Sequence, residues 1–321
     1  MTGTRLLSRP LPGAALAGIT TMVSGVSVWV NSYGVRAIHS ASVYTTAKNL
    51  VAAAVLLCLA GATRLIPGRR PRPSPPTREG RRQGVVRHSL GLTYVGVVGG
   101  GVAFVLFFNG LAATAAASAA FWRDTLVLWV AAMAVPILRE RIRWWNLAAI
   151  GLLVAGQIVM SGGVGHLATD RGQLLVLASS VLWGIEVIVV KTLLRDLPPS
   201  GVGAARMSLG AVALIVYLAA TGRFGQLAAL DLHQLDWALL TGGLLALYVA
   251  TWMAALSRAR AVDVTSVLVG SAVITWLLQT ASGTAAPAPR SLGLLLIAVG
   301  AAAVLWSAAR RPASGRRSVT S

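Results

Sequence analysis

The chain has 321 residues, of which 56% are hydrophobic and only 12% are charged, and its mean hydropathy is +0.73. A soluble globular protein carries about 25% charged residues, so this composition excludes a soluble protein and indicates an integral membrane protein. The single cysteine, Cys58, excludes a disulfide framework and a cysteine-based zinc site.

Ten apolar runs follow one another along the chain. A transmembrane helix needs about 20 mostly apolar residues, and the first run is long enough to be a full span rather than a cleavable signal peptide. The sequence therefore predicts an all-α polytopic membrane protein with ten transmembrane helices. The predicted spans lie near residues 13–31, 42–63, 91–111, 115–137, 144–162, 172–193, 201–221, 237–256, 262–282 and 291–309.

The basic residues alternate between the two sides of these spans. With a cytoplasmic N-terminus, the inner connections hold 21 of the 28 lysines and arginines, and the outer connections hold four. This bias predicts that both termini are cytoplasmic. The Arg/Pro-rich segment 64–90 is predicted to be a disordered cytoplasmic loop, and 310–321 a basic cytoplasmic tail. The net charge of +19 is thus attributed to membrane orientation and anionic lipid, not to nucleic acid.

The two halves of the chain resemble each other weakly. The second span reads AKNLVAAAVLLCLAG from Ala47, and the seventh reads ARMSLGAVALIVYLA from Ala205. With five spans in each half, the second half enters the membrane from the opposite side. Residues 13–162 and 172–309 are therefore predicted to be two inverted five-helix repeats, an arrangement found in many secondary transporters.

Two further stretches are informative, GLAATAAASAA (110–120) and ILRERIRWWNLAAIGLLVAGQIVM (137–160). With the ten-span pattern, they make the chain similar to the EamA-type ten-helix members of the drug/metabolite transporter superfamily. Glu140 and Arg141 resemble the Glu-Arg pair that closes the family's fourth span. The chain departs from the family in having no proline deep in the fourth span and no acidic residue after the ninth.

The resemblance implies a secondary transporter that moves a small organic metabolite (an amino acid, amine or drug-like compound) by alternating access, with export the common direction. The expected partners are this solute, protons and the lipid bilayer, and a homodimer is left open. The Ala-, Gly- and Arg-rich composition is typical of a high-GC bacterial genome, so the bacterial plasma membrane is the expected location. Two alternatives remain: a lipid or lipid-linked flippase, and a non-transporting membrane scaffold that recruits a partner through residues 64–90.

An enzyme is not expected, because the sequence has no HExxH, GxxxxGK or GxSxG motif and no Asp-rich diphosphate motif. Its four histidines all fall in predicted connections without ligand spacing. No catalytic residue, metal site or cofactor is predicted.

Three ionisable residues near the middle of spans are the candidate cavity residues: Arg123 and Asp124 in the fourth span and Glu186 in the sixth. A charge at this depth costs about 2.5–3.5 kcal/mol on insertion scales and is a functional candidate by default. Because i, i+1 neighbours on a helix do not face each other, Arg123 is expected to pair with Glu186. Asp124 would then be left for a proton or a substrate amine. The structural alternative is an ion pair that only joins two helices, or an Arg123 that reaches an interface.

Several other residues carry weaker expectations. Trp122 and Trp183 neighbour these charges and could stack on a substrate, and Asn109 of the third span is added to the cavity set. Lys48 and Arg206 lie about six residues from their helix ends and are expected to extend toward the interfaces. Asp263 is expected to be a water-accessible helix-start carboxylate. Gly96 and Gly100 form a GxxxG pair that allows close helix contact.

Overall fold

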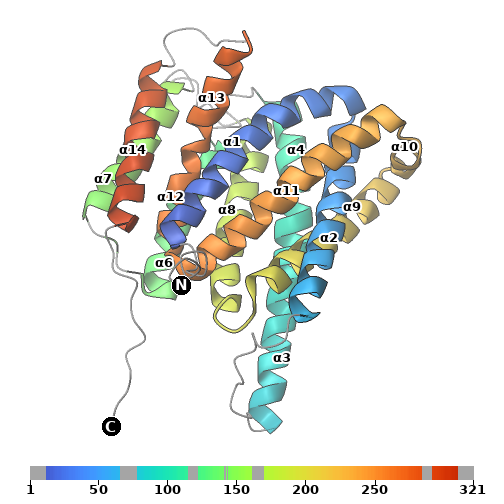
Figure 1. Cartoon of the computed structure of the whole chain (residues 1–321), viewed down its shortest axis with the longest axis horizontal. Coiled ribbons are helices and arrows are strands. Elements are labelled where there is room, and N and C mark those ends of the chain that lie inside the picture. The colour runs from blue at the N-terminus through green and yellow to red at the C-terminus, as the bar shows by residue number, and fades with distance from the viewer. Residues whose placement is uncertain are drawn as a thin grey trace, which may run out of the picture.

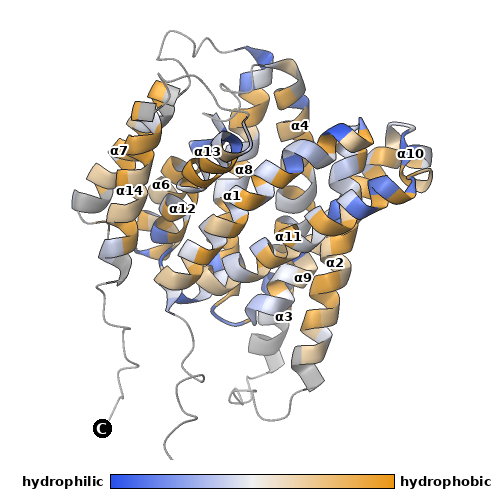
Figure 2. Ribbon diagram, turned by 45° about the horizontal axis from the view of Figure 1, so that its top comes forward, coloured by the Kyte–Doolittle hydropathy of each residue, from blue (hydrophilic) through white to orange (hydrophobic). Residues whose placement is uncertain are grey.

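The computed structural model describes residues 12–65, 78–114, 122–140, 142, 144–160, 170–283 and 291–309. These residues form helices joined by short connections, and no strand occurs among them (Figure 1). Seven of the described helices are long and apolar enough to cross a membrane, and residues 147–156 and 292–307 form two shorter apolar helices. The predicted class, an all-α polytopic membrane protein, agrees with this. In Figure 2, apolar residues run along the bodies of α2, α7 and α14.

The helices follow one another in chain order, with the π-helical segment η2 in the third span. Their bounds are α1 Gly13–Ile38, α2 Ala41–Leu65, α3 Arg78–Thr93, η2 Tyr94–Val102, α4 Ala103–Ala113, α6 Leu126–Leu138, α7 Trp144–Met160, α8 Arg171–Leu193, α9 Pro199–Ala220, α10 Phe224–Ala228, α11 Leu232–Arg258, α12 Ala261–Val269, α13 Ser271–Ala281 and α14 Ser291–Ala309.

Side-chain caps fix where two of the long helices begin. The Asp170 carboxylate accepts a hydrogen bond from the Gln173 N–H at 2.7 Å at the start of α8. This bond, with a second from the Thr114 hydroxyl, holds the pKa of Asp170 below its ordinary value. Asp231 and Gln234 form a capping box at the start of α11. Such caps satisfy backbone N–H groups that the first turn leaves without partners.

The third span is one continuous helical rod that begins before the predicted span. α2 extends to Leu65 and α3 starts at Arg78, so the prediction that residues 64–90 are disordered is wrong for residues 64–65 and 78–90, and residues 66–77 lie outside the described part. The prolines of this segment end at Pro76, and the sequence after it can continue the helix of the span outward. In the N-terminal part of this rod, the Arg87 guanidinium and the His88 ring both contact the Asp196 carboxylate that follows α8.

The fourth and ninth spans are interrupted. In the fourth, residues 122–124 form a helical turn, Thr125 is a turn residue, and helix α6 begins at Leu126, while residues 115–121 are outside the described part. In the ninth, α12 and α13 meet at Gly270, where an added Cβ would lie 3.0 Å from the Ala301 Cβ. Both interruptions lie beside the cavity described below.

Glycines allow η2 to lie directly against α9. A Cβ on Gly210 would come within 2.9 Å of the Gly100 carbonyl oxygen, so the two backbones touch at this point. An added Cβ on Gly96 would overlap the Leu209 side chain of α9. The predicted role of the Gly96–Gly100 pair in close helix contact is therefore confirmed, and its partner is α9.

The helices of the two halves are interleaved rather than segregated. α1 packs along α11, α4 along α8, and α2 along α9, while α7 and α14 form a pair at one edge of the bundle (Figure 1). Every one of these pairs joins a helix of residues 13–162 to a helix of residues 172–309. The core between them is consequently built from both halves.

Candidate substrate cavity

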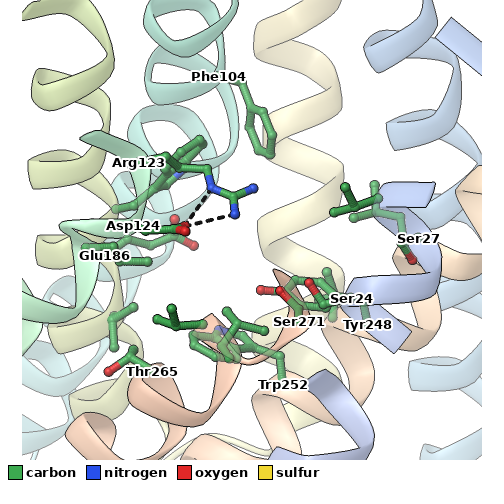
Figure 3. Close-up of a pocket in the computed structure, with 18 of the residues that line it drawn as sticks. Ser24, Ser27, Phe104, Arg123, Asp124, Glu186, Tyr248, Trp252, Thr265 and Ser271 are labelled. Atoms are coloured by element: carbon green, nitrogen blue, oxygen red, sulfur yellow. Dashed lines mark hydrogen bonds and ion pairs between the residues drawn. The ribbon is translucent and has the colours of Figure 1, made fainter. Parts of the chain in front are cut away.

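A cavity of about 250 Å³ lies inside the helix bundle. Its wall combines hydroxyl, amide and charged groups with aromatic rings, contributed by both halves of the chain (Figure 3). Such a mixture of apolar wall and few polar groups is typical of a small-molecule site. The polar and aromatic lining residues are Ser24, Ser27, Asn31, Lys48, Phe104, Arg123, Asp124, Trp183, Glu186, Arg206, Thr241, Tyr248, Trp252, Thr265 and Ser271.

Arg123 and Asp124 form an ion pair with each other on one wall of the cavity (Figure 3). The Arg123 Nε and one terminal nitrogen donate to the Asp124 Oδ1 at 3.1 and 2.9 Å. The predicted pairing of Arg123 with Glu186 is therefore wrong. That prediction held that i, i+1 neighbours on a helix do not face each other, whereas the long Arg123 side chain bends back so that its guanidinium reaches Asp124.

Glu186 pairs instead with Arg206 of α9. The Arg206 Nε donates to one carboxylate oxygen of Glu186, and a terminal nitrogen donates to the other at 3.2 Å. The Glu186 side chain is only 6% exposed and the Arg206 side chain only 12%. The expectation that Arg206 extends to an interface is thus wrong, because this buried carboxylate satisfies its charge within the bundle.

A glycine makes room for the Glu186 carboxylate. An added Cβ on Gly99 of η2 would overlap the carboxyl group of Glu186. The Gly99 carbonyl oxygen also accepts a hydrogen bond from the Trp183 indole at 3.0 Å, one turn before Glu186 on α8. η2 therefore positions both a charged and an aromatic residue of the cavity wall.

Both carboxylates of the cavity are paired with arginines. The expectation that one acidic residue, Asp124, has no internal cation partner is consequently wrong, because Arg206 supplies the second guanidinium. Lys48 is the remaining cation on the cavity wall, and it does not extend to an interface as expected. Its ammonium donates to the Asn31 side-chain oxygen at 3.3 Å and lies 5.0 Å from the centroid of the Tyr44 ring.

The uncharged candidates separate into two groups. Trp183 lines the cavity and packs edge-to-face on Phe104, with ring centroids 5.2 Å apart. Trp122 does not line it, and its indole donates instead to the Gln173 side chain of α8 at 3.0 Å. Asn109 lies at a second cavity, beside His39 and Arg223, and its amide donates to the Val105 carbonyl.

A polar cluster surrounds the connection between α11 and α12. The Glu140 carboxylate accepts from the backbone N–H groups of Ala261 and Val262, at 2.9 and 3.4 Å, and so caps α12. From the opposite side, the Lys191 ammonium donates to the carbonyls of Leu256 and Ala259 at the end of α11.

Asp263 belongs to this cluster and pairs with Arg260 at 2.7 Å. Its side chain is 5% exposed, so the expectation of a water-accessible carboxylate is wrong, although Asp263 does lie in the first turn of its helix. Sequence reasoning missed the roles of Glu140 and Lys191 because both act on backbone groups far away in the sequence. The basic residue in the last turn of α8 was the available signal for Lys191.

Comparisons with known proteins agree with this architecture. Residues 11–162 match the model of the EamA-like transporter family. The resemblance to the drug/metabolite transporter superfamily is thereby confirmed over this part of the chain, and a membrane transporter of the drug/metabolite type is indicated.

The fold as a whole is also found in solved structures. One, titled only "Crystal structure of protein", is similar with a TM-score of 0.69 at 18% identity, covering 92% of this chain and 98% of that one. This likeness concerns the fold alone. No curated protein matches the chain.

Proposed function

We propose that the protein is a secondary transporter that carries a small organic metabolite across the plasma membrane by alternating access, with export as its net direction. The observation that carries this proposal is the central cavity, whose charged wall residues come from α2, the 122–124 turn, α8 and α9, and thus from both halves. Charged groups inside a membrane bundle are costly and mark solute or ion pathways. A proton or solute gradient would supply the energy.

Ten spans in two inverted five-helix repeats form part of this proposal. In such a repeat, α1 corresponds to α8 and the third span corresponds to α11. The contact of α1 with α11 then has a counterpart in the contact of α8 with the third span, and both contacts occur. Because α2 corresponds to α9, the contact of α11 with α2 likewise has a counterpart in the contact of η2 with α9, and again both occur. The α2–α9 and α7–α14 contacts each join a helix to its counterpart in the other half, as a two-fold axis between the halves requires. A two-fold relation between the halves explains this pattern of neighbours, and the EamA-like match to residues 11–162 supports the boundary of the first repeat.

Orientation completes the proposal. The end of the bundle that carries Glu140, Lys191 and Arg260 is the cytoplasmic end by the distribution of basic residues. At this end, the Glu140 and Lys191 contacts hold the α11–α12 connection against α6 and α8. Both termini would lie on the same side.

Flux measurements test this proposal. Metabolites that differ between medium and cells with and without the protein would be identified, and each would then be assayed for uptake by proteoliposomes. Ser27→Phe fills the cavity, whereas Met22→Phe places the same ring on the exposed face of α1. Flux should be lost in the first variant and kept in the second. Wild-type flux in Ser27→Phe, or no flux of any compound by the wild type, would refute the proposal.

A further inference from the structure

The charges on the cavity wall do not balance. Three cations line it, Lys48, Arg123 and Arg206, against two carboxylates. Each arginine is paired with one of the carboxylates, whereas Lys48 contacts no carboxylate among the described residues. A charge that lacks a counter-ion inside a membrane protein is costly. The cavity therefore has a formal excess of one positive charge, and it lies at Lys48.

The contacts of Lys48 leave two of its hydrogen-bond donors unused. An ammonium group has three N–H donors, and one of them bonds the Asn31 side-chain oxygen at 3.3 Å. The other two have no hydrogen-bond partner within the part of the chain that the structure describes. The Tyr44 hydroxyl donates to the same Asn31 oxygen, so this oxygen is fully engaged by two donors.

This arrangement also orients the Asn31 amide. Because lysine and a tyrosine hydroxyl both donate here, the atom facing them is the amide oxygen, and the NH₂ group points the other way. That NH₂ group makes no hydrogen bond to any described residue, although Asn31 lines the cavity. Four residues earlier on α1, and hence on the same face, Ser27 also lines the cavity, and its buried hydroxyl has no partner in the described structure.

We propose that Lys48, Asn31 and Ser27 form the subsite for the carboxylate of the transported solute, so that the substrate is a small monocarboxylate. This inference rests on the proposed transport function and names its substrate class. One negative charge would neutralise the cavity, and the Lys48 ammonium, the Asn31 NH₂ group and the Ser27 hydroxyl each have an unused donor for an anion. A doubly charged group would reverse the imbalance, and an ammonium group would increase it.

The rest of the cavity fits an apolar body on this carboxylate. Trp252, Tyr248 and Trp183 line it together with aliphatic side chains, and Tyr248 and Trp252 stack on each other with centroids 6.0 Å apart. The volume of about 250 Å³ lies just below the range of drug-sized pockets, about 300–1,000 Å³. A single aromatic or branched aliphatic group is therefore the expected size.

Three probes that differ in charge test the proposal on the full-length protein in micelles. They are phenylacetate, its neutral amide phenylacetamide, and the cation phenethylamine, measured by direct binding of labelled phenylacetate and by competition. Lys48→Gln removes the charge but keeps a polar side chain, Lys48→Arg keeps the charge, and Arg36→Gln is a control with the same charge change outside the cavity. Size-exclusion profiles establish that each variant is folded.

Phenylacetate should bind at least about tenfold more tightly than the other two probes, as expected for a hydrogen bond to a charged group. Lys48→Gln should abolish this preference, and Lys48→Arg and Arg36→Gln should keep it. No preference for the carboxylate in the wild type, or an unchanged preference in Lys48→Gln, would overturn the proposed subsite. Counterflow of phenylacetate in proteoliposomes separates the two hypotheses: binding without any flux contradicts transport, whereas flux of another solute without carboxylate preference contradicts only the subsite.

Discussion

Removing the charge of Glu186 should destabilise the protein strongly. In Glu186→Gln, the Arg206 guanidinium loses its carboxylate while it stays inside the bundle, where its side chain is 12% exposed. Breaking a buried ion pair costs about 3–5 kcal/mol because the remaining charge has no counter-ion. The glutamine carbonyl can still accept one hydrogen bond, so we expect the lower end, a loss of about 3 kcal/mol in the free energy of unfolding.

The chain provides a matched control for this experiment. Asp196 forms an ion pair with Arg87 in which the two side chains are 45% and 71% exposed, and exposed pairs contribute only about 0–1 kcal/mol. Asp196→Asn should therefore change stability by less than about 1 kcal/mol. The double variant Glu186→Gln/Arg206→Met removes the stranded charge and should recover part of the loss.

Unfolding free energies would be measured in bicelles by steric trapping, for the single variants and for the double variant. A double-mutant cycle then gives the coupling between Glu186 and Arg206, which should lie between about 0.5 and 3 kcal/mol. If Glu186→Gln costs no more than Asp196→Asn, or if the coupling is zero, the reasoning about a buried and mutually dependent pair is wrong.

Three further predictions concern helix contact, capping and topology. Gly210→Ala should cost about 1–3 kcal/mol, because its Cβ would lie 2.9 Å from the Gly100 oxygen, whereas Gly61→Ala, with nothing within 4 Å, should be neutral or stabilising in the same unfolding assay. Glu140→Gln weakens the cap on α12 and should lower unfolding free energy by about 1 kcal/mol, while the exposed Asp236→Asn should leave it unchanged, and equal values would contradict the capping role. On a Cys58→Ser background, a cysteine introduced at Ser74 should be labelled by an impermeant reagent only after the cells are opened, and labelling in intact cells would disprove a cytoplasmic 64–90 segment.

The sequence by itself determined the class of the protein and the positions of most helices. Hydropathy is a local property, and about 20 apolar residues in succession have few alternatives to a membrane helix. The Gly96–Gly100 spacing also predicted a close helix contact without the tertiary structure, since two small residues one turn apart create a flat helix face. The same holds for the candidate cavity residues Arg123, Asp124 and Glu186, whose cost in a membrane could be read from their positions alone.

Only the tertiary structure decided which charges meet. Arg206 looked like an interfacial residue from its distance to the helix end, yet η2 packs against both α9 and α8, and the Arg206 side chain of α9 reaches Glu186 of α8. Lys48 was expected to extend to an interface for the same reason, although it carries the one unbalanced charge of the described cavity wall. Helical periodicity also gave the wrong partner for Arg123, because the long arginine side chain bends back onto Asp124. Partner choice depends on how the helices pack and on the conformations of long side chains, and packing is a property of the whole bundle rather than of any one segment.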